Sequence, residues 1–366
     1  MVIHRRRSRP RLRLAALAAL PTAVLAIGVP VGIGIAAGGR PHPAASPGRH
    51  AGRPSHARAN GTGQVTQALL VPTAGAYLGA YVQPADYTWQ AQVAAVRSFQ
   101  RQIGTRLELV HVYHPWSDPF PSPADLSFVD EGKVLLLTWG GTPDTKKIIA
   151  GQYDQMIMAR AEAIKALGRP ILMEFRHEMD RPNLRWAIHG PAAYIKAWDH
   201  ITAIFRKAGA DNVGWVWCPT GYGFQVGRAE AFYPGNAEVD WVCEDVYSFA
   251  PSQSLAQAAA PFLAWASHTK KPVIIGEFAV NGPPAAWPAW LTAAGGFCRK
   301  NPQIKAIAYF DANGKDSNGI PFTYWLGGHP QALTSFARLA ATPYFHPTIP
   351  GGSGGSPPQA STAREP

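Results

Sequence analysis

Cysteine is scarce in this chain, with three residues among 366. Three cysteines are too few for a disulfide scaffold, and the Cys-x-x-Cys and Cys/His spacings typical of structural zinc are absent. Cys218 and Cys243 fall in two apolar runs that are predicted to be neighbouring strands, so a bridge between them is geometrically possible. Buried free thiols are the interpretation that the sequence favours.

Acidic residues are absent from the first 60 positions, which contain ten Arg and no Asp, Glu or Lys. These arginines account for nearly all of the formal net charge of +11, so the rest of the chain is close to neutral. A folded body without a basic face is not expected to bind nucleic acid or another polyanion. An apolar content of 46% allows that body a sizeable core.

Residues 1–39 combine a basic start with an uncharged apolar stretch, LAALAALPTAVLAIGVPVGIGIAAGG. This is the layout of a signal peptide, and the stretch is also long enough to span a bilayer as an uncleaved anchor. With the arginines held inside, the body of an anchored protein would lie outside. Both alternatives predict an exported protein, either secreted or held outside the cell by a segment that contacts or spans the membrane.

The rest of the chain divides by composition into three parts. Residues 40–72 are rich in Pro, Gly, Ala, Arg and His without periodicity, which predicts a disordered linker. Residues 347–366 form a similar tail. Residues 73–346 are predicted to be one catalytic domain, expected to act as a monomer.

Short apolar runs alternate with helical patterns throughout this domain. Several runs are continuously apolar, which is typical of strands buried on both faces, while the helical segments carry apolar residues at three- and four-residue spacing. Eight such units predict an α/β fold, the (β/α)8 or TIM barrel. A doubly wound sheet also alternates, but more often has a Gly-rich phosphate turn after its first strand, and none is present. The predicted strands cover residues 76–82, 106–114, 133–140, 169–178, 212–219, 238–247, 271–279 and 303–311.

Two glutamates each close an otherwise apolar predicted strand: Glu178 in ILMEFRHEMD and Glu277 in VIIGEFAV. In a (β/α)8 barrel, reactive side chains come from the carboxyl ends of the strands, and the fourth and seventh strands face each other across the mouth. Glycosidic cleavage needs two facing carboxyl groups, one protonated to assist the leaving oxygen and one ionised. The sequence therefore predicts a glycoside hydrolase site built from these two glutamates.

Metal chemistry has little support in the sequence. His111 and His114 are three positions apart, a spacing that sends side chains to opposite faces of a strand. HEMDR lacks the second histidine of a His-Glu-x-x-His zinc helix. No metal ion or other cofactor is expected.

The segments around both glutamates resemble glycoside hydrolase family 26, a (β/α)8 family of retaining β-mannanases and related β-glucanases and xylanases. The resemblance implies Glu178 as the acid/base and Glu277 as the nucleophile. It further implies that His177 orients substrate or the acid, that Tyr247 hydrogen-bonds the nucleophile, and that Trp186 stacks on a sugar ring. It covers roughly residues 73–346 and is carried by FRHEMD followed by Trp186, and by VWCP, YPGNAEVDWVCEDVY and IIGEFA.

Further site candidates come from the predicted strand ends. Trp139, Trp217 and His114 close the third, fifth and second strands, and are expected to contribute to substrate binding, with plain packing as the alternative for the two tryptophans. Arg176 and His177 are candidates for keeping Glu277 ionised.

The sequence also departs from the family pattern, because the usual His-Glu-Met-Asn-Gly ends here in Asp180 and Arg181. A second carboxylate close to Glu178 is expected to raise the pKa of that acid or to disturb sugar binding. The catalytic pair is retained, so the leading hypothesis is an exported endo-β-1,4-glycanase acting on a β-linked plant or microbial polysaccharide, with β-mannan first. The alternatives are a mixed-linkage β-glucanase or xylanase, or a catalytically silent polysaccharide-binding barrel.

Overall fold

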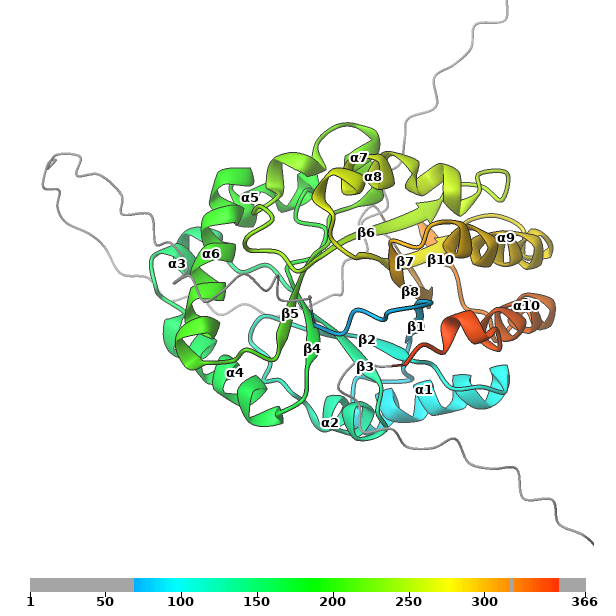
Figure 1. Cartoon of the computed structure of the whole chain (residues 1–366), viewed down its shortest axis with the longest axis horizontal. Coiled ribbons are helices and arrows are strands. Elements are labelled where there is room, and N and C mark those ends of the chain that lie inside the picture. The colour runs from blue at the N-terminus through cyan, green and yellow to red at the C-terminus, as the bar shows by residue number, and fades with distance from the viewer. Residues whose placement is uncertain (1–68, 316–318, 349–366) are drawn as a thin grey trace, which may run out of the picture.

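The computed structural model describes residues 69–315 and 319–348, and in it eight parallel strands form a closed barrel (Figure 1). Each strand pairs with the next along the chain, and β8 pairs with β1, so the predicted (β/α)8 fold is confirmed. The strands are β1 (Tyr77–Val82), β2 (Leu109–His114), β3 (Val134–Trp139), β4 (Ile171–Phe175), β5 (Val213–Trp217), β6 (Trp241–Ser248), β7 (Val273–Val280) and β8 (Ile304–Asp311).

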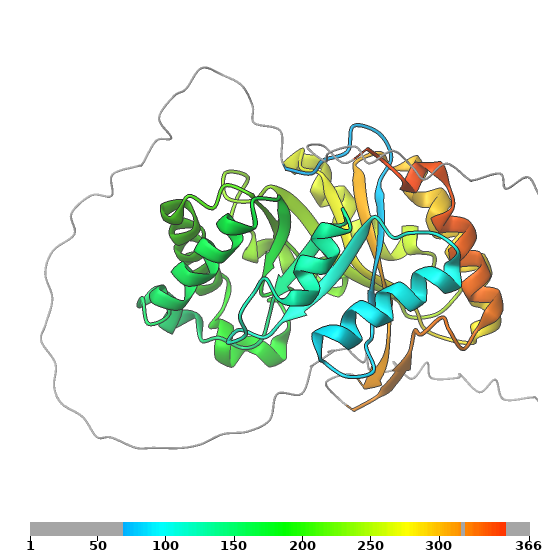
Figure 2. The same cartoon turned by 90° about the horizontal axis from the view of Figure 1, so that it is seen from below.

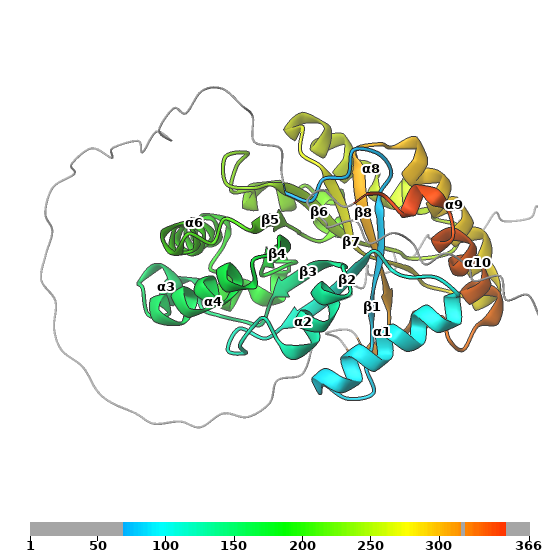
Figure 3. The ribbon, with the colours of Figure 1, turned by 60° about the horizontal axis from the view of Figure 1, so that its bottom comes forward.

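Helices follow the strands and cover the outside of the barrel. Figure 3 shows α3, α4 and α6 side by side on one flank, with α1, α9 and α10 on another. The helices are α1 (Trp89–Ile103), α2 (Pro123–Asp130), α3 (Thr145–Ile149), α4 (Asp154–Leu167), α5 (Arg185–Ile188), α6 (Pro191–Ala208), α7 (Gly221–Gln225), α8 (Leu255–Thr269), α9 (Trp287–Lys300) and α10 (Pro330–Ala340). Short 3₁₀ turns lie at Pro182–Leu184, Ala229–Phe232, Pro284–Ala286 and Pro343–Phe345.

The expected signal or anchor segment (1–39) and almost all of the expected linker (40–72) and tail (347–366) lie outside the described residues. Within the described residues, no helix combines the length and the apolar character needed to cross a membrane.

Local sequence explains how α1 begins and ends. The side chain of Thr88 accepts a hydrogen bond from the backbone N–H of Ala91, which satisfies one of the free donors at the start of α1. Gly104 ends the helix in the left-handed conformation, which glycine adopts without steric cost. The loop before α1 is fixed in turn by Asp86, which accepts hydrogen bonds from the N–H and hydroxyl of Thr88.

A small hairpin extends the end of β8, made of β9 (Asn313–Lys315) and β10 (Pro321–Thr323). Figure 2 shows this hairpin, in orange, at the same end of the barrel as the start of α1, in cyan. The two are tied together because the N–H of Asn313 donates to Gln83 Oε1 at 2.9 Å. The loops after β1 and β8 therefore share one side of the mouth.

The predicted fourth strand runs too long, because β4 stops at Phe175 instead of reaching 178. Arg176 and Glu178 both have positive φ angles, 49° and 53°, which no residue of an extended strand adopts. The chain therefore turns sharply at Arg176 and Glu178, two of the charged residues that follow the apolar run of this strand.

Cys218 and Cys243 form a disulfide between the end of β5 and β6, so the expectation of free thiols is wrong for this pair. Both sulfurs belong to the apolar cluster that fills the inside of the barrel. Adjacent parallel strands bring the two Cα atoms to 4.3 Å, a proximity that the residue spacing in the sequence does not encode. Cys298 is free and buried.

Glu244 on β6 is buried in the layer between the barrel and its helices. Its neighbours Val242 and Val246 belong to the outer apolar core, and a side chain on Gly221 of α7 would collide with its Oε2 atom. Neither carboxyl oxygen has a hydrogen-bond partner among the described residues. Burial therefore raises the pKa of Glu244 well above its usual range, and the group is held in its neutral form.

We expect Glu244→Gln to remove part of the pH dependence of stability. The folded protein keeps the proton on Glu244 while the unfolded chain releases it near the ordinary glutamate pKa, so wild-type stability falls as the pH rises above that value. Glutamine carries no ionisable group. The variant should match the wild type near pH 4 and exceed it by about 1–3 kcal/mol at pH 8 in urea unfolding. Identical curves at both pH values would contradict this account.

Candidate active site

Glu178 and Glu277 meet at the mouth of the barrel. Their Oε2 and Oε1 atoms lie 3.9 Å and 4.0 Å from the same atom, Nε2 of His177. The two oxygens are therefore no more than about 8 Å apart, which is within the range over which two carboxyl groups act on one glycosidic bond. Both side chains are almost fully buried, with exposed fractions of 4% and 3%.

Glu277 is held by two phenols. Tyr113, on β2, donates to Oε1 at 2.5 Å, and Tyr247, on β6, donates to Oε2. Burial first, and the charge of Glu277 next, raise the pKa of both tyrosines well above the usual range, so both remain donors. Two hydroxyl donors favour the ionised form of a carboxyl group, as a nucleophile requires. The resemblance pointed to Tyr247, but sequence reasoning missed Tyr113, although its place two residues after His111 on one strand face was a usable signal.

Glu178 has the opposite environment. Burial raises its pKa to about 7, opposed by the guanidinium of Arg181, which forms an ion pair with Oε2, and assisted by the charge of Glu277. Its backbone N–H donates to the carbonyl of Cys218 at 2.7 Å, which holds the strained φ angle in place. Arg181 was singled out only as a departure from a family pattern, and its pairing with Glu178 was not predicted.

His177 is a neutral imidazole. Burial, followed by the charges of Arg176 and Arg181, lowers its pKa well below the usual range. Arg176 donates to the carbonyl of His177, and burial lowers the pKa of Arg176 to about 10. The expectation that these two residues keep Glu277 ionised is therefore wrong, because the donors to Glu277 are the two tyrosines.

Asp180 directs its carboxylate away from Glu178 and toward the start of α7. It accepts hydrogen bonds from the N–H and hydroxyl of Thr220, at 2.9 Å and 2.6 Å, and pairs with Arg228 at 3.3 Å. Any Cβ on Gly223 would overlap this carboxylate, so the close approach requires glycine there. Asp180 still raises the pKa of Glu178, as expected, but as the weakest of the causes.

Three expected substrate-binding residues lie outside the site. Trp139 is fully buried and stacks on Trp116, with ring centres 4.1 Å apart. Trp217 is fully buried against Trp265 in the helix layer. His114 is buried against Asp125 of α2, with Nε2 2.8 Å from a carboxylate oxygen. In each case alternation along the strand turns the side chain outward, so these predictions are wrong.

Trp186 stands on α5, in the loop after β4, and 64% of its side chain is exposed. Most other exposed large apolar side chains of the described residues also lie in or beside loops at the carboxyl ends of strands. They include Tyr87 and Trp89 after β1, Phe249 after β6, and Trp325 after β8. Burial first, and Tyr87 and Glu277 next, raise the pKa of Tyr81, which places the side chain of Tyr87 near Tyr81 at the mouth.

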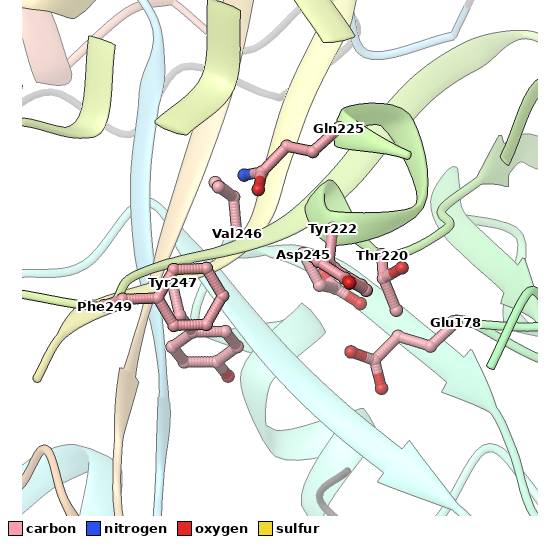
Figure 4. Close-up of a pocket in the computed structure, with 8 residues that line it drawn as sticks. All are labelled: Glu178, Thr220, Tyr222, Gln225, Asp245, Val246, Tyr247 and Phe249. Carbon is pink, nitrogen blue, oxygen red and sulfur yellow. The ribbon is translucent and has the colours of Figure 1, made fainter. Parts of the chain in front are cut away.

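A small pocket lies beside Glu178 (Figure 4). Asp245 and Tyr247 line it from β6, Tyr222 and Gln225 from α7, and Phe249 covers its edge. Asp245 is buried with its Oδ2 atom unpartnered, and burial raises the pKa of this carboxyl well above its usual range. The pocket thus combines apolar faces with a neutral acid, next to the carboxyl group of Glu178.

Two clusters in the described residues have the donor types of a metal site. Glu174 lies near Cys218 and Cys243, but sulfurs joined in a disulfide carry no thiolate to bind a metal. His177, Asp245 and Glu277 form the second cluster, in which both oxygens of Glu277 already accept phenol hydrogen bonds.

Known proteins are similar to this chain in sequence and in fold. Residues 127–272 match the sequence profile described as Glycosyl hydrolase family 26, a range that contains Glu178 and ends just before Glu277. Endoglucanase H of Acetivibrio thermocellus is 29% identical over 325 residues, covering 81% of this chain but 34% of that protein, so the chain spans about a third of this relative's length.

Solved structures show the same fold at lower identity. A family 26 β-mannanase from Bacteroides ovatus superposes with a TM-score of 0.55 at 15% identity, covering 74% of this chain and 90% of that one. A β-mannanase from a symbiotic protist of the termite Reticulitermes speratus, complexed with a gluco-manno-oligosaccharide, gives 0.52 at 16% identity, covering 74% and 88%.

Carbon-detected NMR of labelled glutamates should show Glu178 titrating at about pH 7. Replacing Arg181 by Met removes the charge that lowers this pKa, so the Glu178 titration should move to higher pH. Arg206→Met, which removes an arginine paired with the distant Glu238, is the control and should leave the titration in place. A midpoint that stays fixed or moves downward in Arg181→Met would refute the ion-pair assignment.

Proposed function

The chain belongs to glycoside hydrolase family 26, and from this we propose that it is a retaining endo-β-1,4-glycanase with Glu178 as acid/base and Glu277 as nucleophile. The observation that carries the proposal is the asymmetry of two buried carboxyl groups around one imidazole nitrogen. One carboxyl group accepts from two phenols and suits an ionised role, while the other has a pKa raised to about 7.

In the first step, Glu277 attacks the anomeric carbon and forms a glycosyl ester, while the proton of Glu178 passes to the departing oxygen. Arg181 opposes protonation of Glu178, so the acid is neutral only because burial and the nearby charge of Glu277 outweigh the guanidinium. His177, being neutral and within 4.0 Å of both acids, can bond a sugar hydroxyl without disturbing either charge.

In the second step, water attacks the anomeric carbon, the bond from that carbon to Glu277 breaks to release its carboxylate, and Glu178 accepts the proton of the water. Esterification removes the negative charge of Glu277, which is one of the causes that raise the pKa of Glu178. With Arg181 still in place, the pKa of Glu178 falls when the base is needed. The same residue therefore serves as acid and then as base.

The substrate proposed first is β-mannan. The activity named for the two superposed β-mannanases supports it, together with exposed rings at the mouth that suit the C–H faces of a sugar chain. A β-glucan is the second candidate, supported by the relative named Endoglucanase H. Because the described rings sit on several loops, we propose that a long chain lies across the mouth and is cut internally.

We also propose that the enzyme acts outside the cell. The support is the sequence of residues 1–39, with its basic start and long uncharged apolar stretch. A polymeric substrate is consistent with such a location because a long polysaccharide must be cut before import.

Glu178→Ala and Glu277→Ala should each abolish release of reducing ends from mannan, mixed-linkage glucan or xylan, whichever the wild type cleaves. General acid–base catalysis contributes roughly 10²–10⁴-fold, so Glu178→Ala should retain cleavage of an aryl glycoside whose leaving group needs no proton. Glu277→Ala should not cleave this aryl glycoside, because it lacks the nucleophile. The matched control is Glu244→Gln, another buried acid, which should retain activity. Full polysaccharide hydrolysis by either alanine variant, or polysaccharide binding by wild type without turnover, would reject the proposal.

Trp186→Ala should raise KM for the polysaccharide about tenfold, corresponding to ~1.4 kcal/mol, with little change in kcat on a short aryl glycoside. The control is Leu126→Ala, which removes an exposed apolar side chain from α2. Equal effects of the two variants would mean that Trp186 is not a sugar platform.

A further inference from the structure

A chain of hydrogen-bonded side chains runs through the inside of the barrel beneath the nucleophile. Glu174 on β4, Thr138 on β3 and His111 on β2 have exposed fractions of 0%, 0% and 1%. Thr138 Oγ1 lies 2.5 Å from Glu174 Oε2 and 2.7 Å from His111 Nε2. None of the three touches the pocket or belongs to the pair of catalytic glutamates.

The other ring nitrogen of His111 connects this chain to the active site. Nδ1 lies 3.1 Å from the carbonyl of Gly276, the residue before Glu277, and 3.2 Å from the hydroxyl oxygen of Tyr113. A carbonyl can only accept, so Nδ1 must carry a proton. Tyr113 directs its own hydroxyl proton to Glu277, so its oxygen is free to accept from Nδ1–H.

The threonine sets the protonation of the remaining links, because one hydroxyl proton cannot serve both of its neighbours. If Thr138 donates to Glu174, then Nε2 of His111 must donate to Thr138, which makes an imidazolium beside a carboxylate. If Thr138 donates to Nε2, then Glu174 must itself carry the proton. The two arrangements contain the same number of protons and no net charge, as complete burial favours.

The second arrangement is favoured by the other oxygen of Glu174. Oε1 lies 3.7 Å from Cys243 Sγ, and a disulfide sulfur has no hydrogen to donate. A carboxylate would have the hydroxyl of Thr138 as its one hydrogen-bond donor, with Nε2 of His111 3.7 Å from Oε2, whereas a neutral acid needs no donor at Oε1. Every link then points one way: Glu174 donates to Thr138, Thr138 to His111, His111 to Tyr113, and Tyr113 to Glu277. Hydrogen bonds aligned in this way strengthen one another.

We propose that Glu174 is a positioning residue for Glu277, acting through Thr138, His111 and Tyr113 to fix the direction and strength of the phenol hydrogen bond to the nucleophile. The role assigned to Glu277 rests on the proposed function, but the hydrogen-bond order does not. An apolar residue of similar size would fill the same space, and buried polar groups replaced in this way often leave a protein equally or more stable. Glu174 is therefore explained by what it does to the site rather than by stability.

Glu174→Met and Glu174→Gln separate this role from packing. Methionine fills the space but cannot donate to Thr138, so kcat should fall 10- to 100-fold, with KM changed less than twofold because no substrate contact is lost. The pH profile of kcat should also shift, because the phenol that donates to Glu277 is then held less firmly. Glutamine keeps an N–H donor for Thr138 and should stay within threefold of wild-type kcat with an unshifted pH profile.

Glu244→Met is the matched control, since Glu244 is an equally buried acid on the outside of the barrel with no link to the site. It should change stability without changing kcat or the pH profile. The proposal is overturned if Glu174→Met keeps wild-type kcat, if Glu174→Gln loses as much activity as Glu174→Met, or if Glu244→Met shows the same loss and shift.

A second measurement does not depend on activity. Nitrogen-15 NMR of labelled histidine should show His111 protonated at Nδ1 from pH 5 to 9 in the wild type and in Glu174→Gln. In Glu174→Met, Nδ1 should stay protonated on the Gly276 carbonyl, but the Nε2 resonance should shift because the Thr138 hydroxyl no longer receives a hydrogen bond that directs its own proton to Nε2. A His111 signal unaffected by Glu174→Met would overturn the proposed chain, even if the wild type hydrolysed every polysaccharide tested. A preserved NMR result with no hydrolysis would reject only the function of the site.

Discussion

Two carboxyl groups buried within 4.0 Å of one imidazole nitrogen are the feature on which the rest of this site depends. Two neighbouring acids out of water cannot ionise equally, because each charge raises the cost of the other. The surroundings decide which one ionises. Glu277 receives two phenol donors, while Glu178 receives mainly burial, moderated by Arg181. The division into nucleophile and acid therefore follows from neighbours on β2, β6 and the turn after β4.

The turn after β4 is conformationally strained, and hydrogen bonds to neighbouring segments hold it in place. Arg176 and Glu178 have left-handed backbone angles, each costing on the order of 1–3 kcal/mol for such residues. The backbone N–H of Glu178 donates to the carbonyl of Cys218. The carboxylate of Asp180 accepts a hydrogen bond from Thr220 and forms an ion pair with Arg228. Asp180, which departs from the family pattern, thus helps to anchor the acid's loop to α7. Arg181, the other departure, touches the acid directly.

The barrel interior is polar near the mouth and apolar below it. His111, Thr138 and Glu174 form the polar layer, and residues such as Leu109, Leu136 and Ile274 fill the floor. The helix layer holds most of the large buried aromatic rings, including Trp139 and Trp217. A Trp at a strand end thus belongs to the outer core here, whereas the rings available to a ligand are those carried by loops, such as Trp186 and Tyr87.

The sequence alone determined the eight strand–helix units, the strand ends at which Glu178 and Glu277 meet, and the place of Tyr247. These features depend on apolar periodicity, which is a local property of the sequence, and on the order of strands in a closed ring, which follows from the order of strands along the chain. Only the tertiary structure decided the strand faces of Trp139, Trp217 and His114, the Cys218–Cys243 bond, and the donors Tyr113 and Arg181. Side chains along a strand alternate between the two faces, so misjudging the inward-facing position by one residue exchanges the side chains assigned to the barrel interior with those assigned to the helix layer. Contacts between strands depend on their register, which no single strand encodes.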